Sequence, residues 1–329
     1  LFQNYSKISS EFYGNHNAVN LAAYAQADIT PVEKLKLVAG VRLEFNSLNG
    51  ESDRIVPLFR AGLNYRLSDY TFLRASYGQG YRYPSIAEKF AATTLGAVRI
   101  VPNPDILPES GWSSEIGIKQ GLAISNLGGF ADLAFFYTRN TDMIEYLFGI
   151  YPDPAGSSFS YGFKSTNIEN SKVYGTELSF LLNMEDSRLN HSISGGYTFI
   201  HPLEINPRAN EQDILYLKYR RKHSFKINYS GDYRFLEFGM DISIASKILR
   251  IDEVFLNELT REIILPGFYD YWIASNKGNI IIDPNIGIEV AENYRISFAI
   301  KNILNAEYMG RPGDILPQRH FSLRFSGRF

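Results

Sequence analysis

The last ten residues of the chain alternate between polar and apolar side chains and end on an aromatic one. Successive side chains of a β-strand point to opposite faces, so this segment predicts a strand with one face for hydrocarbon and one for water. The apolar face would carry Phe321, Leu323, Phe325 and Phe329, and the polar face His320, Ser322, Arg324, Ser326 and Arg328. A strand of this kind is typical of a membrane-spanning β-barrel.

The composition supports a barrel over a helical membrane protein. The 329 residues are 45% hydrophobic and include 22 Tyr and 23 Phe, while the mean hydropathy is only −0.18. No segment offers the roughly 18 uninterrupted apolar residues that a spanning helix needs. A formal charge of −2 argues against a nucleic-acid partner, which usually leaves a basic imprint. The chain has no Cys, and no signal peptide is recognisable at Leu1, so we expect it to be processed or to begin within a longer protein.

Alternating segments recur along the whole chain and predict about thirteen antiparallel strands. The predicted strands span residues 17–29, 35–46, 57–67, 70–81, 111–121, 128–142, 163–181, 189–201, 216–231, 234–249, 278–290, 294–304 and 318–329. Residues 1–13 could form one more strand.

The connections between these strands are alternately short and long, as in outer-membrane barrels with tight periplasmic turns and longer extracellular loops. The long connections lie near residues 47–56, 82–110, 143–162, 202–215, 250–277 and 305–317. Aromatic residues lie beside the short turns, as an interfacial girdle would: Tyr65, Tyr70, Tyr233, Phe235 and Tyr294.

Three passages resemble the TonB-dependent outer-membrane receptors. Residues 74–90, RASYGQGYRYPSIAEKF, followed by VPNPDILPESGWSSEIGIK at 101–119, resemble the family's mid-barrel signature, although Leu107 stands one position later than usual. NIENSKVYGTELSF at 167–180 resembles a strand in which Gly precedes a lumenal Glu. The segment ending in HFSLRFSGRF resembles the terminal strand pair.

The resemblance implies a 22-stranded barrel with an amino-terminal plug, in the outer membrane of a Gram-negative bacterium. No plug is recognisable, so residues 1–329 are expected to form the carboxyl-terminal portion of one barrel domain. Unpaired strand edges in lipid cost several kcal/mol per backbone group. We therefore expect residues 17–29 and 318–329 to pair, on their outer edges, with strands outside this sequence.

The resemblance also implies partners. These are the TonB-ExbB-ExbD complex, acting through the plug, the barrel-assembly machinery, acting on Phe329, and a small-molecule or oligomeric nutrient. Lipid and lipopolysaccharide would surround the barrel, and the run Arg220-Arg221-Lys222 could bind lipopolysaccharide phosphates, although a solvated barrel rim is the simpler interpretation.

Candidate ligand-binding residues lie on the long loops. Arg82 and Tyr83 could contact an anionic ligand, or Gly80 and Pro84 could simply shape the exit from the strand. Two aromatic clusters could stack against a sugar, a catecholate or a macrocycle, or they could form a girdle or pack a folded loop. The candidates in these clusters are Tyr146, Phe148, Tyr151 and Tyr161, and Phe268, Tyr269, Tyr271 and Trp272.

No catalytic residue, metal site or cofactor is predicted. The five His residues are scattered and no catalytic motif is present. The resemblance also disfavours haem uptake, because haem receptors of this family usually place a His between the two parts of the mid-barrel signature, and this sequence has none between Arg82 and Asn103. Two functions remain: uptake of a ferric siderophore, or otherwise of cobalamin, a glycan or a peptide, and a passive pore or scaffold without energised transport.

Overall fold

The computed structural model describes residues 1–95, 98–152, 159–168, 170–186, 189–205, 215–291 and 293–327. It contains a 15-stranded antiparallel sheet and a separate four-stranded sheet. The strands of the large sheet are β1 (Phe2–Ser10), β2 (Gly14–Val32), β3 (Leu35–Leu48), β4 (Glu51–Ser52), β5 (Val56–Arg66), β6 (Thr71–Arg82), β9 (Glu109–Ile124), β10 (Leu127–Thr141), β13 (Ser171–Glu185), β14 (Leu189–Glu204), β15 (His223–Tyr233), β16 (Leu236–Ala245), β17 (Asn279–Ala291), β18 (Tyr294–Lys301) and β19 (His320–Gly327).

The remaining elements lie in the long connections. The small sheet contains β7 (Thr93–Leu95), β8 (Val98–Val101), β11 (Ile144–Pro152) and β12 (Phe159–Asn167), and the helices are α1 (Ile86–Phe90), η1 (Glu253–Phe255), α2 (Arg261–Ile264) and α3 (Phe268–Ser275). Among the described residues, no helix is both long enough and apolar enough to cross a membrane.

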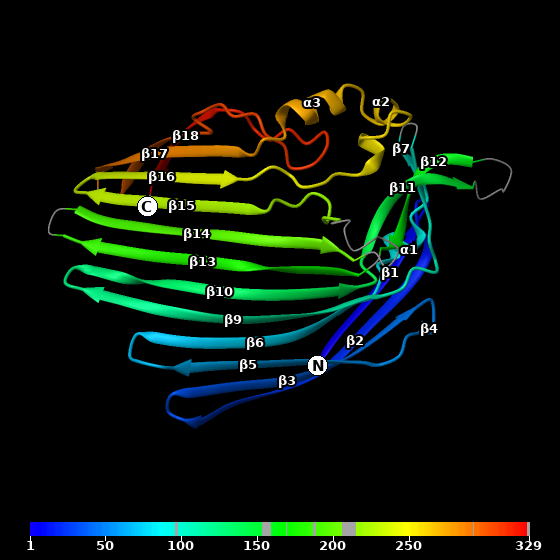
Figure 1. Ribbon diagram of the computed structural model, residues 1–329, viewed down its shortest axis with the longest axis horizontal. Coiled ribbons are helices and arrows are strands. Elements are labelled where there is room, and N and C mark those ends of the chain that lie inside the picture. The colour runs from blue at the N-terminus through cyan, green and yellow to red at the C-terminus, as the bar shows by residue number, and fades with distance from the viewer. Residues whose placement is uncertain are drawn as a thin grey trace.

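The large sheet is a curved wall of strands that follow one another in chain order from β1 to β19, with β4 paired only to β3 (Figure 1). Within the described ranges β1 and β19 do not pair with each other. The predicted antiparallel barrel wall is therefore confirmed, and it is open. The expectation that residues 17–29 pair with a strand outside the sequence is wrong, because β1 covers that edge from Gly14 to Ala22.

The short turns lie together at one end of the wall, at the left of Figure 1, and the long loops lie at the other end. Three of the short turns span only residues 33–34, 125–126 and 234–235. The predicted aromatic residues lie beside these turns, and the rings of Tyr294 and Phe325 stack with centroids 5.7 Å apart. The predicted alternation of turn lengths is thus present at opposite ends of one sheet.

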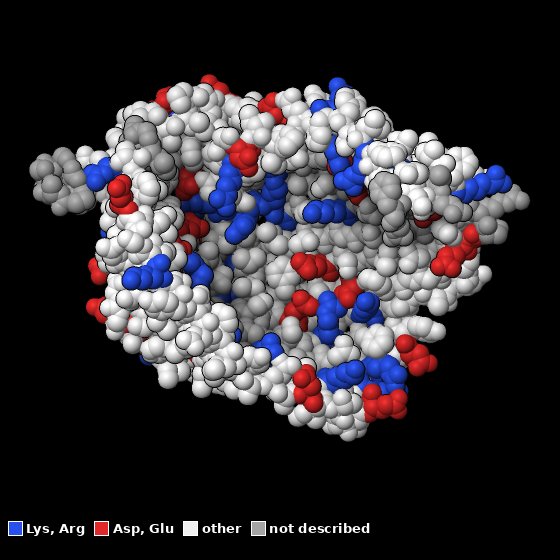
Figure 2. All heavy atoms as spheres, turned by 180° about the vertical axis from the view of Figure 1, so that it is seen from behind, with Lys and Arg blue, Asp and Glu red and all other residues white. Residues whose placement is uncertain are grey.

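The two faces of the wall differ as the alternation predicts. Figure 2 shows a hollow in which Lys, Arg, Asp and Glu side chains gather. Within the wall Arg74 pairs with Glu115 at 2.9 Å and with Asp132 at 2.7 Å. On the opposite face Leu323 and Phe325 are 75% and 67% exposed, as expected for side chains that lie against lipid. Phe329 lies outside the described residues, so its recognition by the assembly machinery stays a prediction.

Two predicted strands differ from the observed ones for a shared reason. Residues 163–181 are not one strand, because β12 ends at Asn167 and β13 begins at Ser171. Asn167 forms the last pair of the β11–β12 ladder, and its side chain bonds the backbone of Leu107 and of Asp142, each at 2.8 Å. Similarly, the strand predicted at 216–231 begins only at His223, since Arg221 bonds the carbonyls of Ser246 and Met309. Contacts between loops, which periodicity does not encode, set both boundaries.

Candidate functional site

A charged clasp joins the end of β6 to the start of β9. Arg82 donates to Glu109 at 2.5 Å and to both carboxylate oxygens of Glu88 at 2.9 Å. Ser85 caps α1 in a capping box with Glu88, which satisfies the free N–H groups of the first helical turn. Burial raises the pKa of Glu88, but hydrogen bonds from Ser85 and Arg82 outweigh burial, so this pKa lies below its usual value. The clasp therefore holds the helix at the mouth of the barrel wall.

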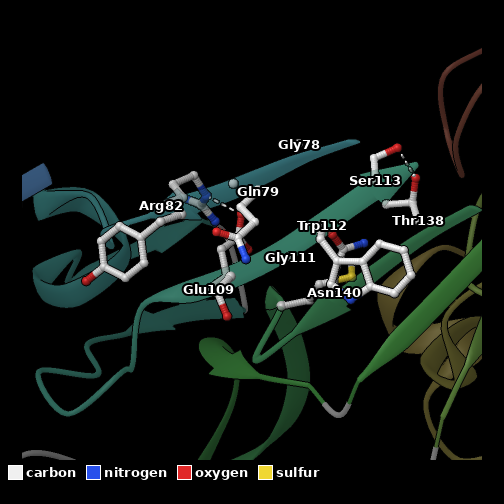
Figure 3. A pocket seen from close by; sticks show the side chains of 13 residues that line it. Gly78, Gln79, Arg82, Glu109, Gly111, Trp112, Ser113, Thr138 and Asn140 are labelled. Carbon is white, nitrogen blue, oxygen red and sulfur yellow. Dashed lines mark hydrogen bonds and ion pairs between the residues drawn. The ribbon is translucent and has the colours of Figure 1, made fainter. Parts of the chain in front are cut away.

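A cavity of about 480 Å³ lies beside this clasp. Figure 3 shows Arg82 and Glu109 bonded to each other at one end of the cavity, with Trp112 and Asn140 farther along. Part of its lining is open at Gly78 and Gly80, because a Cβ at either position would meet nothing within 4 Å. The Arg82 guanidinium already contacts two carboxylates, so an anion entering the cavity would compete with both for it. Ligand contact by Arg82 and Tyr83 stays a prediction.

The hairpin of β11 and β12 carries the first aromatic cluster on one face. Because Phe148 pairs in register with Phe163, and Ile150 with Tyr161, alternate positions on both strands share that face. The aromatic face is defined by Tyr146, Phe148, Ile150, Phe159, Tyr161 and Phe163. Of the predicted residues, Tyr146, Phe148 and Tyr161 belong to it. Tyr151 lies on the opposite face, where its hydroxyl donates to the Leu147 carbonyl at 3.0 Å.

The aromatic face is preorganised and open. The Phe148 ring stacks on Tyr161 with centroids 5.8 Å apart and meets Phe163 edge-on at 5.3 Å. Tyr161 remains 39% exposed and Phe159 74% exposed. At its base the face meets α1, where the Tyr146 hydroxyl reaches the Ala87 carbonyl at 3.4 Å. Burial raises the pKa of Tyr146, so the phenol is neutral at physiological pH.

The base of the hairpin is tied to the clasp by backbone-directed bonds. Ser165 is fully buried and donates to the carbonyl of Glu88. Asn103 donates in turn to the Ser165 carbonyl at 2.7 Å. The family-like segment at 80–109 therefore positions the aromatic face through α1.

The second predicted cluster packs inside a folded loop. Phe268 and Trp272 on α3 are 7% and 8% exposed, in a core with Ile248, Ile251 and Met309. Tyr271 packs against the same core, and the guanidinium of Arg261 lies 4.1 Å from the centre of the Tyr269 ring. This placement favours the alternative in which these aromatic residues pack a loop.

An ionic link between the loops was not predicted from the sequence. Lys218 contacts Asp252 at 2.5 Å and Glu145 on β11 at 3.5 Å. Tyr219 donates to Asp252 as well, and burial followed by that bond raises its pKa. These contacts connect the aromatic hairpin to the loop that follows β16. Residues this far apart in sequence give no local signal for such pairing.

The described residues contain no group of three or more His, Cys, Asp or Glu placed to hold a metal ion. The five His residues occur separately, and His16 stacks on Phe90 with centroids 3.8 Å apart. At this end of the molecule the described side chains offer stacking surfaces and ion pairs.

Comparison with known proteins agrees with this geometry. A vitamin B12 transporter, BtuB of Vibrio vulnificus (strain YJ016), is 24% identical over 230 residues, which cover 70% of this chain and 31% of that protein. The siderophore receptor PirA of Acinetobacter baumannii has a TM-score of 0.67 at 12% identity, covering 98% of this chain and 47% of that one. The ferric-catecholate import receptor Fiu of E. coli K12 has a TM-score of 0.66 at 18% identity, and the match covers 96% of this chain and 45% of that one.

The chain thus spans about half the length of these structures and a third of the curated relative. A family model described as "TonB dependent receptor-like, beta-barrel" matches residues 2–303. The chain therefore belongs to the TonB-dependent receptor β-barrel family of the bacterial outer membrane.

Proposed function

We propose that this chain forms the carboxyl-terminal portion of the barrel of a receptor that imports a scarce, bulky nutrient. A ferric siderophore is the favoured nutrient, and cobalamin, a glycan or a peptide are the others. Energy would reach the receptor from the TonB-ExbB-ExbD complex through a plug encoded elsewhere in the full protein. The chain's family and the functions of the similar proteins, which include siderophore receptors and a vitamin B12 transporter, support this proposal.

The aromatic face of the β11–β12 hairpin is the observation that carries the choice of nutrient. Tyr161 and Phe159 are exposed, and Phe148 is held between Tyr161 and Phe163. Rings fixed in this way lose little conformational freedom when a flat ligand stacks on them. A catecholate complex presents such flat aromatic surfaces on its exterior. An aromatic face therefore favours a catecholate over a peptide or a glycan.

Replacing the central rings should weaken nutrient binding. In the full-length receptor, Phe148→Ala with Tyr161→Ala should reduce affinity for a ferric tris-catecholate complex by about tenfold or more, because each stacking contact contributes about 0.5–1.5 kcal/mol. Tyr151→Ala is the matched control, since Tyr151 lies on the opposite face of the same strand. Titration monitored by tryptophan fluorescence measures both, with cyanocobalamin as a second probe. Equal affinities for the double variant and the control would contradict the proposed face.

The alternative is a passive pore or scaffold. The open lumen with charged side chains, shown in Figure 2, is the observation that favours it. A pore would conduct ions in planar bilayers without TonB, and nutrient uptake would not respond to loss of the membrane potential.

The open edges of the wall support the proposed division of the barrel. Among the described residues, β1 and β19 each have a neighbouring strand on one side only, and each unpaired backbone group in lipid costs several kcal/mol. We propose that further strands of the same protein close the gap between them.

A disulfide test can distinguish a barrel in which other strands lie between β1 and β19 from one in which β1 and β19 pair directly. In the full-length receptor, Ser6→Cys combined with Ser322→Cys or with Ser326→Cys should give no disulfide, because other strands would lie between β1 and β19. Ser6→Cys with Ala18→Cys is the positive control, since these residues pair in register. Mobility on non-reducing gels reports the bond. A bond from β1 to β19 would mean that the ring closes with this chain alone.

A further inference from the structure

A second cavity, of about 340 Å³, is hollowed in the wall where β2, β3 and β5 lie side by side. Its lining takes residues from two successive rows of one face of the sheet. One row contains Tyr24, Arg42 and Leu58, and the next contains Gly40 and Arg60. From the other face the lining takes only the single row between these two, so the cavity opens on the side of Arg42 and Arg60. It is called the wall cavity below.

Arg60 has a glycine on each side, because it pairs in register with Gly40 on β3 and with Gly78 on β6. Gly78 lies four residues after Arg74 on β6 and shares its face. Since Arg74 forms its ion pairs in the lumen, the wall cavity opens to the lumen. A Cβ at position 40 would lie 3.0 Å from the Arg60 Nε, so the arginine side chain lies over Gly40. At position 78 a Cβ would meet nothing within 4 Å, which leaves room beside the guanidinium.

The two charged side chains of the wall cavity are both arginines with free N–H groups. No ion pair or hydrogen bond joins Arg60 to any residue that the structure describes, whereas Arg74 contacts two carboxylates. Arg42 pairs in register with Leu58, two residues from Arg60, so the two guanidinium groups are diagonal neighbours. Arg42 bonds Glu44 through its Nε at 3.1 Å, and within the described ranges its two terminal nitrogens form no hydrogen bond. A guanidinium presents its N–H groups in a fork that matches the two oxygens of a carboxylate.

The other lumenal side chains of the wall cavity are largely apolar. Leu58 and Tyr24 lie on the two strands that flank Arg42, each directly opposite it in register. Tyr24 is 63% exposed, so its ring offers a surface for stacking. A mostly apolar cavity with a few convergent polar groups is the usual form of a site for a small organic molecule. The volume of the wall cavity lies near the lower end of the range for such sites, roughly 300–1,000 Å³, which fits a compact ligand and not a bulky one.

We infer that the wall cavity binds a small organic carboxylate. Arg60 and Arg42 hold the carboxylate oxygens, and a compact apolar body packs against Leu58 and the Tyr24 ring. The site is distinct from the aromatic face of the β11–β12 hairpin, which belongs to the separate four-stranded sheet. The inference therefore does not depend on the identity of the imported nutrient.

Three small probes test the chemistry of the site in the full-length receptor. Benzoate carries a carboxylate on a compact apolar body, benzamide keeps the body without the charge, and acetate keeps the charge without the body. Benzoate should bind about tenfold or more tightly than either of the others, because only benzoate makes both the charge-assisted hydrogen bonds and the apolar contacts. Ligand-observed NMR titration of the receptor in detergent measures the three affinities. A benzoate affinity equal to that of benzamide or of acetate would overturn the inference, as would failure of the receptor to bind benzoate.

Substitutions on β5 locate the site. Arg60→Gln should lower the affinity for benzoate by about tenfold or more, because the charge-assisted bonds to the carboxylate are lost, and should leave that for benzamide unchanged. Leu58→Trp should remove benzoate binding by filling the cavity while both arginines remain. The matched control is Arg66→Gln, which removes a charge from the same face of the same strand but outside the cavity. Unchanged benzoate affinity in Arg60→Gln would overturn the inference.

If Arg60→Gln does not fold, Gly40→Ala decides in its place. This variant keeps every charge, and it should fold because the atoms nearest to the new Cβ belong to the flexible side chain of Arg60. It should displace the guanidinium and lower benzoate affinity severalfold, and an unchanged affinity would count against the site. Phe148→Ala with Tyr161→Ala should bind benzoate normally, which separates this test from that of the uptake proposal. Loss of benzoate binding in that double variant would place the probe on the aromatic face and overturn the inference.

Discussion

A Leu178→Arg variant should lose barrel assembly, whereas Ser179→Arg, one residue along the same strand, should assemble normally. Leu178 lies within a row of apolar side chains that runs across the outer face of the wall. In register, this row contains Leu73, Ile118, Leu133, Leu178, Tyr197 and Phe225. Leu178 is 42% exposed in this structure, and the surface that it exposes faces lipid. Arg at the bilayer midplane of a barrel costs about 2–4 kcal/mol.

Ser179 is a close control because it is the next residue on the same strand and faces the lumen. It pairs in register with Asp132, which is a lumenal carboxylate bonded to Arg74. Arg at position 179 would therefore meet water and a negative charge. The folded fraction, measured as the heat-modifiable band after refolding into vesicles, and the urea midpoint check the difference. Equal tolerance of the two substitutions would show that the facing of β13 is wrong.

The sequence could predict which side chains face lipid and which face the lumen, because lipid and water impose a period of two on every spanning strand. The same rule did not predict a strand that forms mainly through pairing with its neighbour. Residues 2–10 contain the mostly polar segment FQNYSKISS, which offers little alternation, yet they form β1 by pairing with β2. The rule also failed to separate β12, which ends at Asn167, from β13, which begins at Ser171, because the side-chain bonds of Asn167 that accompany this boundary leave no trace in the alternation.

The aromatic clusters show what sequence spacing can distinguish. Tyr146, Phe148 and Ile150 recur with a period of two, as do Phe159, Tyr161 and Phe163, and this spacing predicts a hairpin with one aromatic face. Phe268, Tyr271 and Trp272 recur at i, i+3 and i+4, which predicts a helix that buries one side. The two clusters could thus have been separated by their periods. The link from Lys218 to Glu145 and Asp252 could not, because it joins three loops.

Gly175→Ala should destabilise the barrel, whereas Gly78→Ala should not. Gly175 belongs to the family-like segment VYGTELSF of β13. A Cβ at position 175 would lie 1.9 Å from the Phe199 carbonyl oxygen and 2.9 Å from the Phe136 ring. A backbone oxygen cannot move aside as a flexible side chain can, so β13 and β14 would have to separate locally. Overpacking of this kind costs about 1–3 kcal/mol.

Gly78 gives the matched comparison, because a Cβ there meets nothing within 4 Å. Ala at position 78 should leave stability unchanged or raise it by about 0.4–1 kcal/mol through loss of freedom in the unfolded chain. Urea unfolding of both variants in vesicles measures the difference. A Gly175→Ala barrel as stable as the Gly78→Ala one would mean that β13 and β14 lie too far apart for a Cβ at position 175 to meet the Phe199 carbonyl. The expected loss of stability would instead assign Gly175 a steric role. Without a Cβ at this position, the Phe199 carbonyl of β14 and the ring of Phe136 can pack directly against β13. The strand then stays in register, and Glu177 keeps its position on the lumenal face.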